Sequence, residues 1–371
     1  MSITKHLTRT LTYLWLGINA FFALMFVVGA YIGYVHPENS SYAALLGLGY
    51  PIPMTITLLF IPFWLIFNKK LSLLSIASLL VAFPQFWSFS PLNVKSLFYE
   101  PSDKDFSVMT YNVFGMKDQT ESEDGNATIT EILKYDTDIV CLQESPTDKA
   151  LKRIADDYQW NLLEKRYPYR IFDESNGMLS RNPIKKFYSH DDQNYFLLTV
   201  YQTEIDSTAT FIVNTHLESI GLTADDKELY MELTSVKDKN KTLKGVRSQL
   251  MNKLKNAYTN RARQAEMIRG VIDSLALAQP EANLILCGDF NDTSYGYAYL
   301  TICGDDLHDA YADAAFGPTH TYNANRFYFK IDHILYKGRL EARRTIRGNV
   351  KSSDHYPLVT YFETKSKSKS K

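Results

Sequence analysis

The sequence predicts an α/β domain preceded by an all-α transmembrane module of three helices. Two observations lead to this fold class. Charge is nearly absent from the first part of the chain, where Glu38 is the only formally charged residue between Arg9 and Lys69. After Lys104, short apolar and β-branched runs alternate with helical or polar stretches. Such alternation is typical of a layered α/β core, and a composition of 45% hydrophobic residues excludes a disordered chain.

The overall charge balance of the 371 residues hides this division. The chain carries 40 basic and 41 acidic residues, a net charge of -1, which gives no sign of a polyanion-binding protein. Residues 1–100 hold five basic and two acidic residues, a net +3, so the remainder carries -4. We therefore divide the chain into a transmembrane module at 1–100, a globular domain at 101–364 and a basic, disordered tail at 365–371.

Three apolar stretches in the module are long enough to cross a bilayer, namely residues 11–34, 42–67 and 71–89. At about 1.5 Å per residue, each covers a hydrocarbon core roughly 30 Å thick. The buried helical core of a soluble domain is the alternative, but such helices normally have a polar face, which these stretches lack. A cleaved signal peptide is a second alternative for the first stretch, whose apolar run is too long for one.

The basic residues predict how these spans are oriented. Lys5 and Arg9 precede the first span, and Lys69 and Lys70 lie between the second and third, whereas residues 36–41 contain no lysine or arginine. Because lysine and arginine concentrate in cytoplasmic loops, the N-terminus is expected in the cytoplasm and everything after the third span on the other side. The sequence thus predicts a multi-pass protein of the plasma (inner) membrane with an extracytoplasmic globular domain.

The globular domain shows six apolar runs that we interpret as buried strands. Residues 222–274 are helical by pattern, with Ala262, Ala265, Ile268 and Ile272 on one face. Lysines crowd the first part of this insertion, either as a solvated helix surface or as a contact for a phosphate polymer or an anionic headgroup. The expected strands are residues 106–113, 138–142, 196–201, 208–214, 283–287 and 331–335.

Acidic, amide and imidazole side chains recur where the predicted strands end. The carboxyl ends of strands are where α/β folds tend to place ligand sites. A single carboxylate in such a position is usually a cap or turn residue, and a single histidine is usually a core or surface group. Six such positions in an ordered series are hard to attribute to capping. They are Asn112, Glu144, His216, Asp289 with Asn291, Asp332 with His333, and Asp354 with His355.

As a set, these residues resemble the motifs of the endonuclease/exonuclease/phosphatase superfamily, which includes DNase I, exonuclease III, neutral sphingomyelinases and inositol polyphosphate phosphatases. The resemblance covers about residues 105–362 and indicates a membrane-anchored, bacterial-type member. The matching segments are Thr110-Tyr111-Asn112, Leu142-Gln143-Glu144, Asn176-Gly177-Met178-Leu179-Ser180-Arg181, Asn214-Thr215-His216, Gly288-Asp289-Phe290-Asn291, Ile331-Asp332-His333 and Ser353-Asp354-His355.

The resemblance implies a four-layer α/β/β/α sandwich of the DNase I type, with a divalent metal at one end. Glu144 is then expected to be the principal ligand of Mg²⁺ or Mn²⁺, with Asn112 and Asp354 close to it. Oxygen ligands suit these cations, and the sequence has no cysteine–histidine cluster for zinc. His355 is expected to be the catalytic imidazole and Asp332 the carboxylate that orients it.

The remaining motif residues are assigned to water and to the substrate phosphate. The resemblance implies that Asp289 and Asn291 position the attacking water and hold a phosphate oxygen. It also implies that His216 and Arg181 contact the scissile phosphate. A metal and hydrogen-bond donors would neutralise the phosphorane, while a base generates hydroxide for in-line attack.

The expected function is divalent-metal-dependent hydrolysis of phosphoester bonds by a membrane-anchored, nuclease-like phosphodiesterase, whose His–Asp pair activates water. The substrate is a nucleic acid or a lipid or small-molecule phosphate. The alternatives are a phosphodiesterase for phospholipid or sphingomyelin-like headgroups, an inositol-phosphate phosphatase, and a catalytically inactive membrane scaffold, which the complete set of motif groups disfavours. A transporter is disfavoured because the spans lack intramembrane charges. Apart from the lipid bilayer, no obligate partner is inferred.

Overall fold

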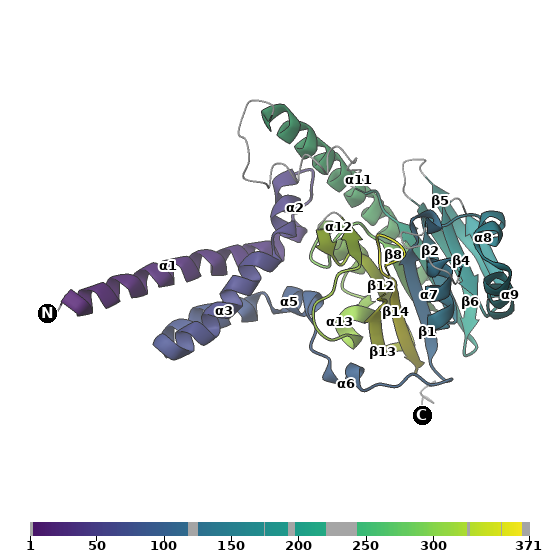
Figure 1. Cartoon of the computed structure of the whole chain (residues 1–371), viewed down its shortest axis with the longest axis horizontal. Helices are drawn as coiled ribbons and strands as arrows, with labels where there is room; N and C mark the ends of the chain where they lie inside the picture. The colour runs from purple at the N-terminus through teal and green to yellow at the C-terminus, as the bar shows by residue number, and fades with distance from the viewer. Residues whose placement is uncertain are drawn as a thin grey trace.

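The computed structural model describes residues 3–117, 125–173, 175–191, 197–219, 243–324, 327–349 and 351–365. Within these residues, two six-stranded mixed sheets lie face to face, and helices pack on the outer face of each (Figure 1). The two sheets and their covering helices form the expected α/β sandwich. The first part of the predicted helical insertion and almost all of the predicted basic tail lie outside the described residues.

The first sheet is built around β1, all seven residues of which are buried. β1 pairs in parallel with β2 and antiparallel with β14, so β1 and β2 end at the same edge. Helices α7 to α9 cover the outer face through one apolar cluster. In the order β13-β14-β1-β2-β4-β3, the strands are Leu340–Arg347, Leu358–Thr364, Phe106–Asn112, Ile139–Gln143, Asn176–Ser180 and Tyr169–Asp173, and the helices are Ala127–Tyr135, Asp148–Ile154 and Asp157–Arg166.

The second sheet is built around the parallel pair β7 and β8. Helices α11 (Leu243–Ala278) and α12 (Tyr297–Cys303) cover its outer face. The predicted apolar face of the long helix is buried as expected. In the order β5-β6-β7-β8-β12-β9, the strands are Lys185–Asp191, Leu197–Ile205, Thr208–His216, Asn283–Asp289, Asp332–Lys337 and His308–Asp309; α13 (Ala310–Ala314) and the hairpin of β10 (Tyr322–Ala324) and β11 (Phe327–Phe329) complete the domain.

The core between the sheets explains why these strands could be recognised in the sequence. Val108 and Cys141 of the first sheet and Ile212 and Cys287 of the second belong to one buried cluster. The opposite faces of the same strands pack on helices, so the central strands are buried on both sides. Strands of this kind appear as nearly continuous apolar runs.

The N-terminal module differs from the three uninterrupted spans predicted at 11–34, 42–67 and 71–89. Among the described residues, one helix is long and apolar enough to cross a membrane: α1 (Ile3–Tyr31), continued by the 3-10 helix η1 (Ile32–Tyr34). The second stretch is divided into α2 (Ser41–Leu48) and the 17-residue α3 (Pro51–Phe67). The third is divided into α4 (Ser72–Val81) and α5 (Phe83–Phe89), which meet at a bend of 72° and can form at most one broken span.

Backbone chemistry explains both interruptions. Gly49 follows the end of α2, and Pro51 occupies the first position of α3, where its missing N–H costs nothing. Pro84 likewise lies in the first turn of α5, because proline cannot continue α4. The prolines and glycines are visible in the sequence, but the prediction from hydropathy alone treated the helices that they separate as single spans.

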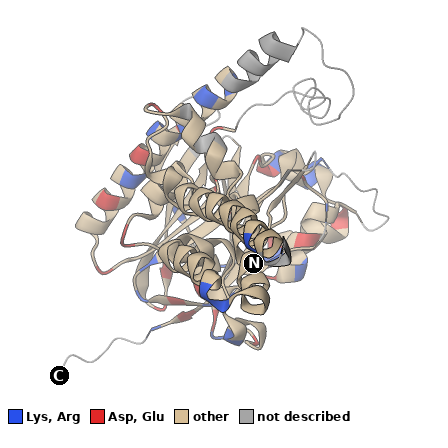
Figure 2. Ribbon diagram, turned by 90° about the vertical axis from the view of Figure 1, so that its left-hand side faces the viewer, with Lys and Arg blue, Asp and Glu red and all other residues tan. Residues whose placement is uncertain are grey.

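The module is a layer of helices that extends away from the sandwich. α1 and α3 project from one side of the domain in Figure 1 and are uncharged over nearly their whole length in Figure 2. The hydroxyl of Ser75 in α4 donates to Oδ1 of the buried Asn19 in α1, at 3.0 Å. The outer face of α1 exposes large apolar side chains such as Phe21 and Leu24.

The near end of the module packs directly on the segment that follows β8. The ring of Tyr295 lies 4.6 Å from that of Tyr50 and 6.3 Å from that of Phe89 (centroid distances). A Cβ added to Gly33 would lie 2.1 Å from the carbonyl oxygen of Tyr295, so only glycine allows this approach. The indole N–H of Trp87 donates to the carbonyl oxygen of residue 312, at 3.0 Å. The module and the sandwich therefore share a packed junction.

Candidate active site

Six of the residues singled out in the sequence meet at one edge of the sandwich. Because β1 and β2 are parallel, Asn112 and Glu144 follow neighbouring strands to the same edge. β7 and β8 do the same in the other sheet, where His216 lies opposite Asp289 in the register. The sheets face each other, so the two pairs approach across the top of the core. The gathered residues are Asn112, Glu144, His216, Asp289, Asp332 and His355.

Two local backbone features bring the carboxylates into place. Gly288 has a φ of +151°, and an added Cβ would lie 1.8 Å from the carbonyl oxygen of Thr215. Only glycine therefore lets β8 approach β7 this closely immediately before Asp289. Glu144 has a φ of +49°, in the left-handed region that non-glycine residues rarely occupy. Such outliers concentrate at functional sites.

Asp289 is the centre of the arrangement. Its Oδ2 atom accepts a hydrogen bond from Nδ2 of Asn112 at 3.0 Å and lies 3.6 Å from Nε2 of both His216 and His355. Its Oδ1 atom accepts from the backbone N–H of Asn291 at 2.8 Å. The side chain is almost completely buried, and this burial raises the pKa of Asp289. A buried carboxylate with a raised pKa is suited to accept a proton.

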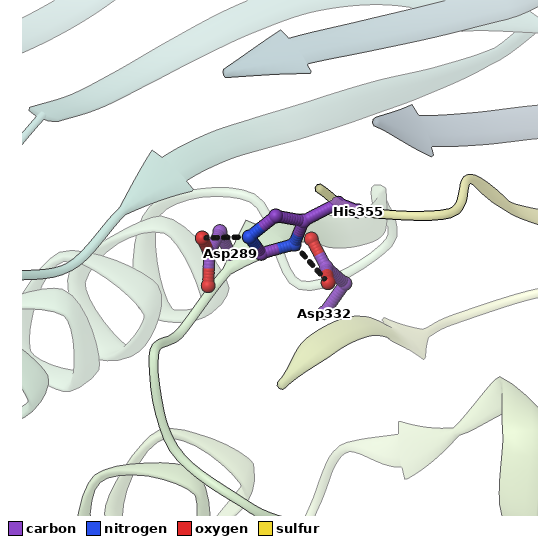
Figure 3. Close-up of side chains that lie close together, drawn as sticks. All are labelled: Asp289, Asp332 and His355. Carbon is purple, nitrogen blue, oxygen red and sulfur yellow. Dashed lines mark hydrogen bonds and ion pairs between the residues drawn. The ribbon is translucent and has the colours of Figure 1, made fainter. Parts of the chain in front are cut away.

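His355 lies between two carboxylates (Figure 3). Its Nδ1 atom is 2.8 Å from Oδ2 of Asp332, and its Nε2 atom faces Asp289. Burial alone would lower the pKa of His355, but the charges of Asp332 and Asp289 and the hydrogen bond raise it to about 10. The imidazole therefore carries protons on both nitrogens at neutral pH. The backbone N–H of Asp332 donates to Oγ1 of Thr321 at 3.1 Å, which fixes the start of β12.

Glu144 and Asp354 form the part of the site that fits a hard cation. Burial raises the pKa of Asp354, and the negative charges of Glu144 and Asp289 raise it further. The Glu144 side chain is 39% exposed, so it can be reached from solvent. Carboxylate oxygens are the ligands that Mg²⁺ and Mn²⁺ prefer.

Asn112, predicted to be a metal ligand, lies between Glu144 and Asp289. Its Oδ1 atom accepts from the backbone N–H of Phe114 at 3.1 Å. Its Nδ2 atom donates to Oε1 of Glu144 at 3.1 Å and to Asp289. Asn112 therefore bridges the carboxylates of Glu144 and Asp289, and its oxygen keeps a second lone pair that a cation could use.

A second group of possible ligands lies deeper. Asp289, Asp332 and His355 each offer a ligand atom, and these atoms lie within 4.8 Å of one another. A metal bound there would have to replace the protons of an imidazole held between two carboxylates.

Arg181 lies at the opposite edge of the sheet, so the expectation that it contacts the scissile phosphate is wrong. It follows β4, which runs antiparallel to β2, and Ser180 pairs with Ile139 at the start of β2. The guanidinium forms ion pairs with Asp136 and, at 3.6 Å, with Asp138. The sequence motif contains both Asn176 and Arg181, which lie at opposite ends of β4 and therefore at opposite edges of the sheet.

Some site residues were not assigned from the sequence. Asn176, at the site end of β4, is fully buried, and its Oδ1 atom has no hydrogen-bond partner among the described residues. Beneath the carboxylates, Nε2 of Gln143 donates to Oδ1 of Asn214 at 2.7 Å. Asn214 in turn donates to the carbonyl oxygens of Leu142 at 3.0 Å and Gly177 at 3.1 Å, joining the two sheets. These residues could have been found in the sequence, because each is a polar residue within an otherwise apolar strand.

A four-layer sandwich with a buried His–carboxylate pair beside facing carboxylates defines a phosphoester hydrolase. The chain belongs to the endonuclease/exonuclease/phosphatase family, since the model of that family matches residues 109–355, which are 247 of the 371 residues. Its members are divalent-metal-dependent phosphoester hydrolases, and this chain is an enzyme of that class. Residues 11–89 match a second family, described as a domain of unknown function (DUF8431).

The solved structures to which the chain is similar are distant in sequence. TDP2 from Caenorhabditis elegans is 17% identical over 72% of this chain and 77% of that chain, with a TM-score of 0.47. The human nocturnin catalytic domain with bound sulfate is 18% identical over 70% and 94%, with a TM-score of 0.46. A family protein from Bacteroides thetaiotaomicron is 16% identical over 71% and 96%, with a TM-score of 0.43. No curated protein matches the chain.

Proposed function

We propose that the chain is a membrane-anchored, Mg²⁺-dependent phosphodiesterase. The observation that carries this proposal is the buried arrangement in which His355 lies between Asp332 and Asp289, while Asn112 links Asp289 to the more exposed Glu144. It supplies a proton acceptor, a proton donor and oxygen ligands within one group of contacts. These are the parts that phosphoester hydrolysis requires.

Glu144 and Asp354 would hold Mg²⁺ or Mn²⁺, which neutralises negative charge on the phosphate when bound. Asn112 donates its amide N–H groups to Glu144 and to Asp289, and so positions Glu144 beside that site. This role requires that the Glu144 side chain is accessible to solvent, and 39% of it is exposed. Mg²⁺ is the expected ion because the donors are hard oxygen atoms.

The protonation of His355 divides the acid and base roles. With a pKa of about 10, its Nε2 already carries a proton at neutral pH, so it is a hydrogen-bond donor to a phosphate oxygen. Asp289 is then the better acceptor for a proton from water, in place of the His–Asp pair expected from the sequence. His216 faces both Glu144 and Asp289 and is placed to donate to the phosphate.

Asn291 supports these groups from the side. Its backbone N–H donates to Oδ1 of Asp289, and its Nδ2 atom donates to the carbonyl oxygen of Leu217 at 2.9 Å. Asn291 therefore ties the segment after β8 to the residue after His216. We assign it the positioning of Asp289 rather than direct proton transfer.

A soluble substrate tests the chemistry apart from the membrane. The full chain in detergent is expected to hydrolyse a bis-aryl phosphate with Mg²⁺ and to lose this activity with a chelator. Glu144→Gln and His355→Gln keep the side-chain shape and should lower kcat about 10² to 10³-fold. His308→Gln, at an exposed histidine, is the matched control. Unchanged turnover in the two site variants would contradict the assignment.

We also propose that the module anchors the enzyme with the N-terminus in the cytoplasm and the catalytic domain outside it. The apolar surface of α1 supports this, and α3, at 17 residues and about 25 Å, is only slightly shorter than a bilayer core. A reporter active only in the cytoplasm, fused after Lys371, should stay silent. A signal from it would overturn the proposed orientation.

One observation favours a substrate at the bilayer over a nucleic acid. Asn291 and Tyr295 are four residues apart, which limits their separation to about 14 Å of extended chain. Tyr295 packs on Tyr50 at the start of α3. The active site therefore lies close to the end of the module that packs on the catalytic domain. Hydrolysis rates at equal Mg²⁺ concentration should be compared for four substrates: phospholipid in mixed micelles, inositol phosphates, linear DNA and RNA. Faster hydrolysis of DNA than of phospholipid would refute the bilayer assignment.

A further inference from the structure

A cavity of about 230 Å³ lies at the junction between the module and the catalytic domain, beside the active site. The module contributes Pro51, the first residue of α3, and Phe89, the last of α5. The catalytic domain contributes residues 293–295, 318–320 and 328–330. An apolar cavity of about 150 Å³ holds a benzene molecule, so this one has room for several methylene groups.

The chemistry of the lining is amphipathic. Phe89, Tyr295 and Phe329 provide aromatic surface, whereas Thr319 and His320 provide polar groups. Lys330 adds no free charge, because its Nζ atom is 3.2 Å from Oδ2 of Asp309 and lies over the ring of Tyr311. The cavity therefore has an aromatic part and a polar part.

The guanidinium group of Arg347 lies beside the polar part of the cavity. Nη1 of Arg347 donates to Nε2 of His320 at 3.0 Å, and its guanidinium lies 4.3 Å from the ring centroid of Tyr356. Among the described residues, no carboxylate forms a salt bridge with Arg347. Arg347 does not itself line the cavity, but its contact with His320 places an uncompensated positive charge behind the polar part.

The surface around the cavity is apolar. Tyr328, which lines it, is 59% exposed, and Phe316 and Leu92 are 45% and 48% exposed. Leu92 and Phe316 pair through a β-bridge, and Pro318 of the lining follows two residues later. Contiguous exposed apolar side chains on a soluble face mark a contact surface. Here they adjoin the ends of the apolar helices, where a bilayer surface would lie.

We propose that this cavity binds a phospholipid of the surrounding bilayer. Its apolar part lies against Phe89, Tyr295 and Phe329, and its phosphate lies at His320 and Arg347. This inference rests on the proposed membrane anchoring, but not on the identity of the substrate. It adds a second phosphate-binding position, separate from Glu144 and its neighbours.

The bound lipid would also support the active site. Thr293 and Ser294 of the lining come two and three residues after Asn291. His320 precedes Thr321, whose hydroxyl accepts from the backbone N–H of Asp332. Both segments that position catalytic carboxylates thus contact the cavity. Removal of the lipid should lower kcat for a soluble substrate while the metal requirement stays the same.

Photocrosslinking tests the site in the full chain. The enzyme is reconstituted into nanodiscs that contain a phospholipid with a diazirine in its acyl chain, irradiated, digested and mapped by mass spectrometry. Labels are expected on α1 and α3, which face lipid, and also on residues 318–330. Thr319→Trp fills the cavity and should remove the label from 318–330. Leu277→Trp adds the same ring at an exposed position on α11 and should leave it.

A second variant keeps the test decisive if Thr319→Trp does not fold. Arg347→Gln leaves the cavity open and should lower labelling of 318–330 by phospholipid roughly tenfold, through loss of a charged contact. Labelling by a diacylglycerol probe, which lacks the phosphate, should not change. Label on α1 and α3 but none on 318–330, or equal phospholipid labelling of wild type and Arg347→Gln, overturns the inference. No label on α1 and α3 would instead overturn the membrane anchoring, while bis-aryl phosphate hydrolysis reports separately on the chemistry.

Discussion

His333 makes the folded enzyme sensitive to acid in a way that can be calculated. It follows Asp332, and its buried ring lies 4.8 Å from that of Phe290 and 4.7 Å from that of Tyr299. Its Nε2 atom donates to the carbonyl oxygen of Asp292 at 2.9 Å. Burial, assisted by the charge of Lys330, lowers the pKa of His333 to about 3.

The sign of the effect follows from the two pKa values. The pKa of His333 in the unfolded chain is 6.5, so above this pH the residue is neutral in both states and imposes no cost. As the pH falls below 6.5, the unfolded chain takes up a proton that the folded state refuses, and stability is lost. Between pH 7 and pH 5 the loss is about 2 kcal/mol, which lowers Tm by roughly 3 to 4 °C.

Thermal unfolding of the full chain in detergent at pH 7 and pH 5 measures this loss. His333→Gln retains a side-chain N–H for the carbonyl oxygen of Asp292 but cannot be protonated. The variant should be less stable at pH 7, yet its Tm should fall between the two pH values by several degrees less than that of the wild type. His308→Gln, at a side chain that is 65% exposed, controls for loss of a histidine. Equal falls in wild type and His333→Gln would refute the reasoning.

Three further substitutions test the site and the junction. Asp332→Asn removes the charge that orients His355 and should lower kcat by about 10² to 10⁴-fold with little change in KM, as measured by bis-aryl phosphate hydrolysis. Gly33→Ala places a Cβ against the carbonyl oxygen of Tyr295 and should cost about 1 to 3 kcal/mol, seen as a lower Tm and faster proteolysis at the junction. Asn214→Ala removes the nearest acceptor of the buried Gln143 amide and the donor to the carbonyl oxygens of Leu142 and Gly177, and should cost about 1 to 3 kcal/mol in thermal unfolding.

The sequence predicted the strands and the gathering of polar residues well, for a physical reason. The central strands are buried on both faces, so they are unbroken apolar runs, and the residue that follows each one stands out. Parallel pairing then carries Glu144 with Asn112, and Asp289 with His216, to the same edges. The positions of these four residues at the strand ends were therefore enough to predict that their side chains lie close together.

The errors arose where direction and hydrogen bonding decide the outcome. Arg181 shares a motif with Asn176, but β4 lies between them and places them at opposite edges. The sequence also could not show that the Asn112 amide bridges Glu144 and Asp289, because hydrogen-bond partners depend on the folded geometry. Hydropathy likewise cannot distinguish one span from two helices that meet at Pro51.

The segment after β8 connects catalysis to the membrane module. Asp289 contacts the two histidines of the active site, Asp292 anchors the start of α12 through the backbone N–H of residue 298, and Tyr295 enters the aromatic cluster of the module. The 3-10 helix η1 reaches the same segment through Gly33, where no side chain fits. The geometry of Asp289 therefore depends on packing contributed by helices outside the sandwich. For this reason we regard the module as part of the support of the active site, and the membrane anchoring that we propose would make the catalytic chemistry respond to the bilayer.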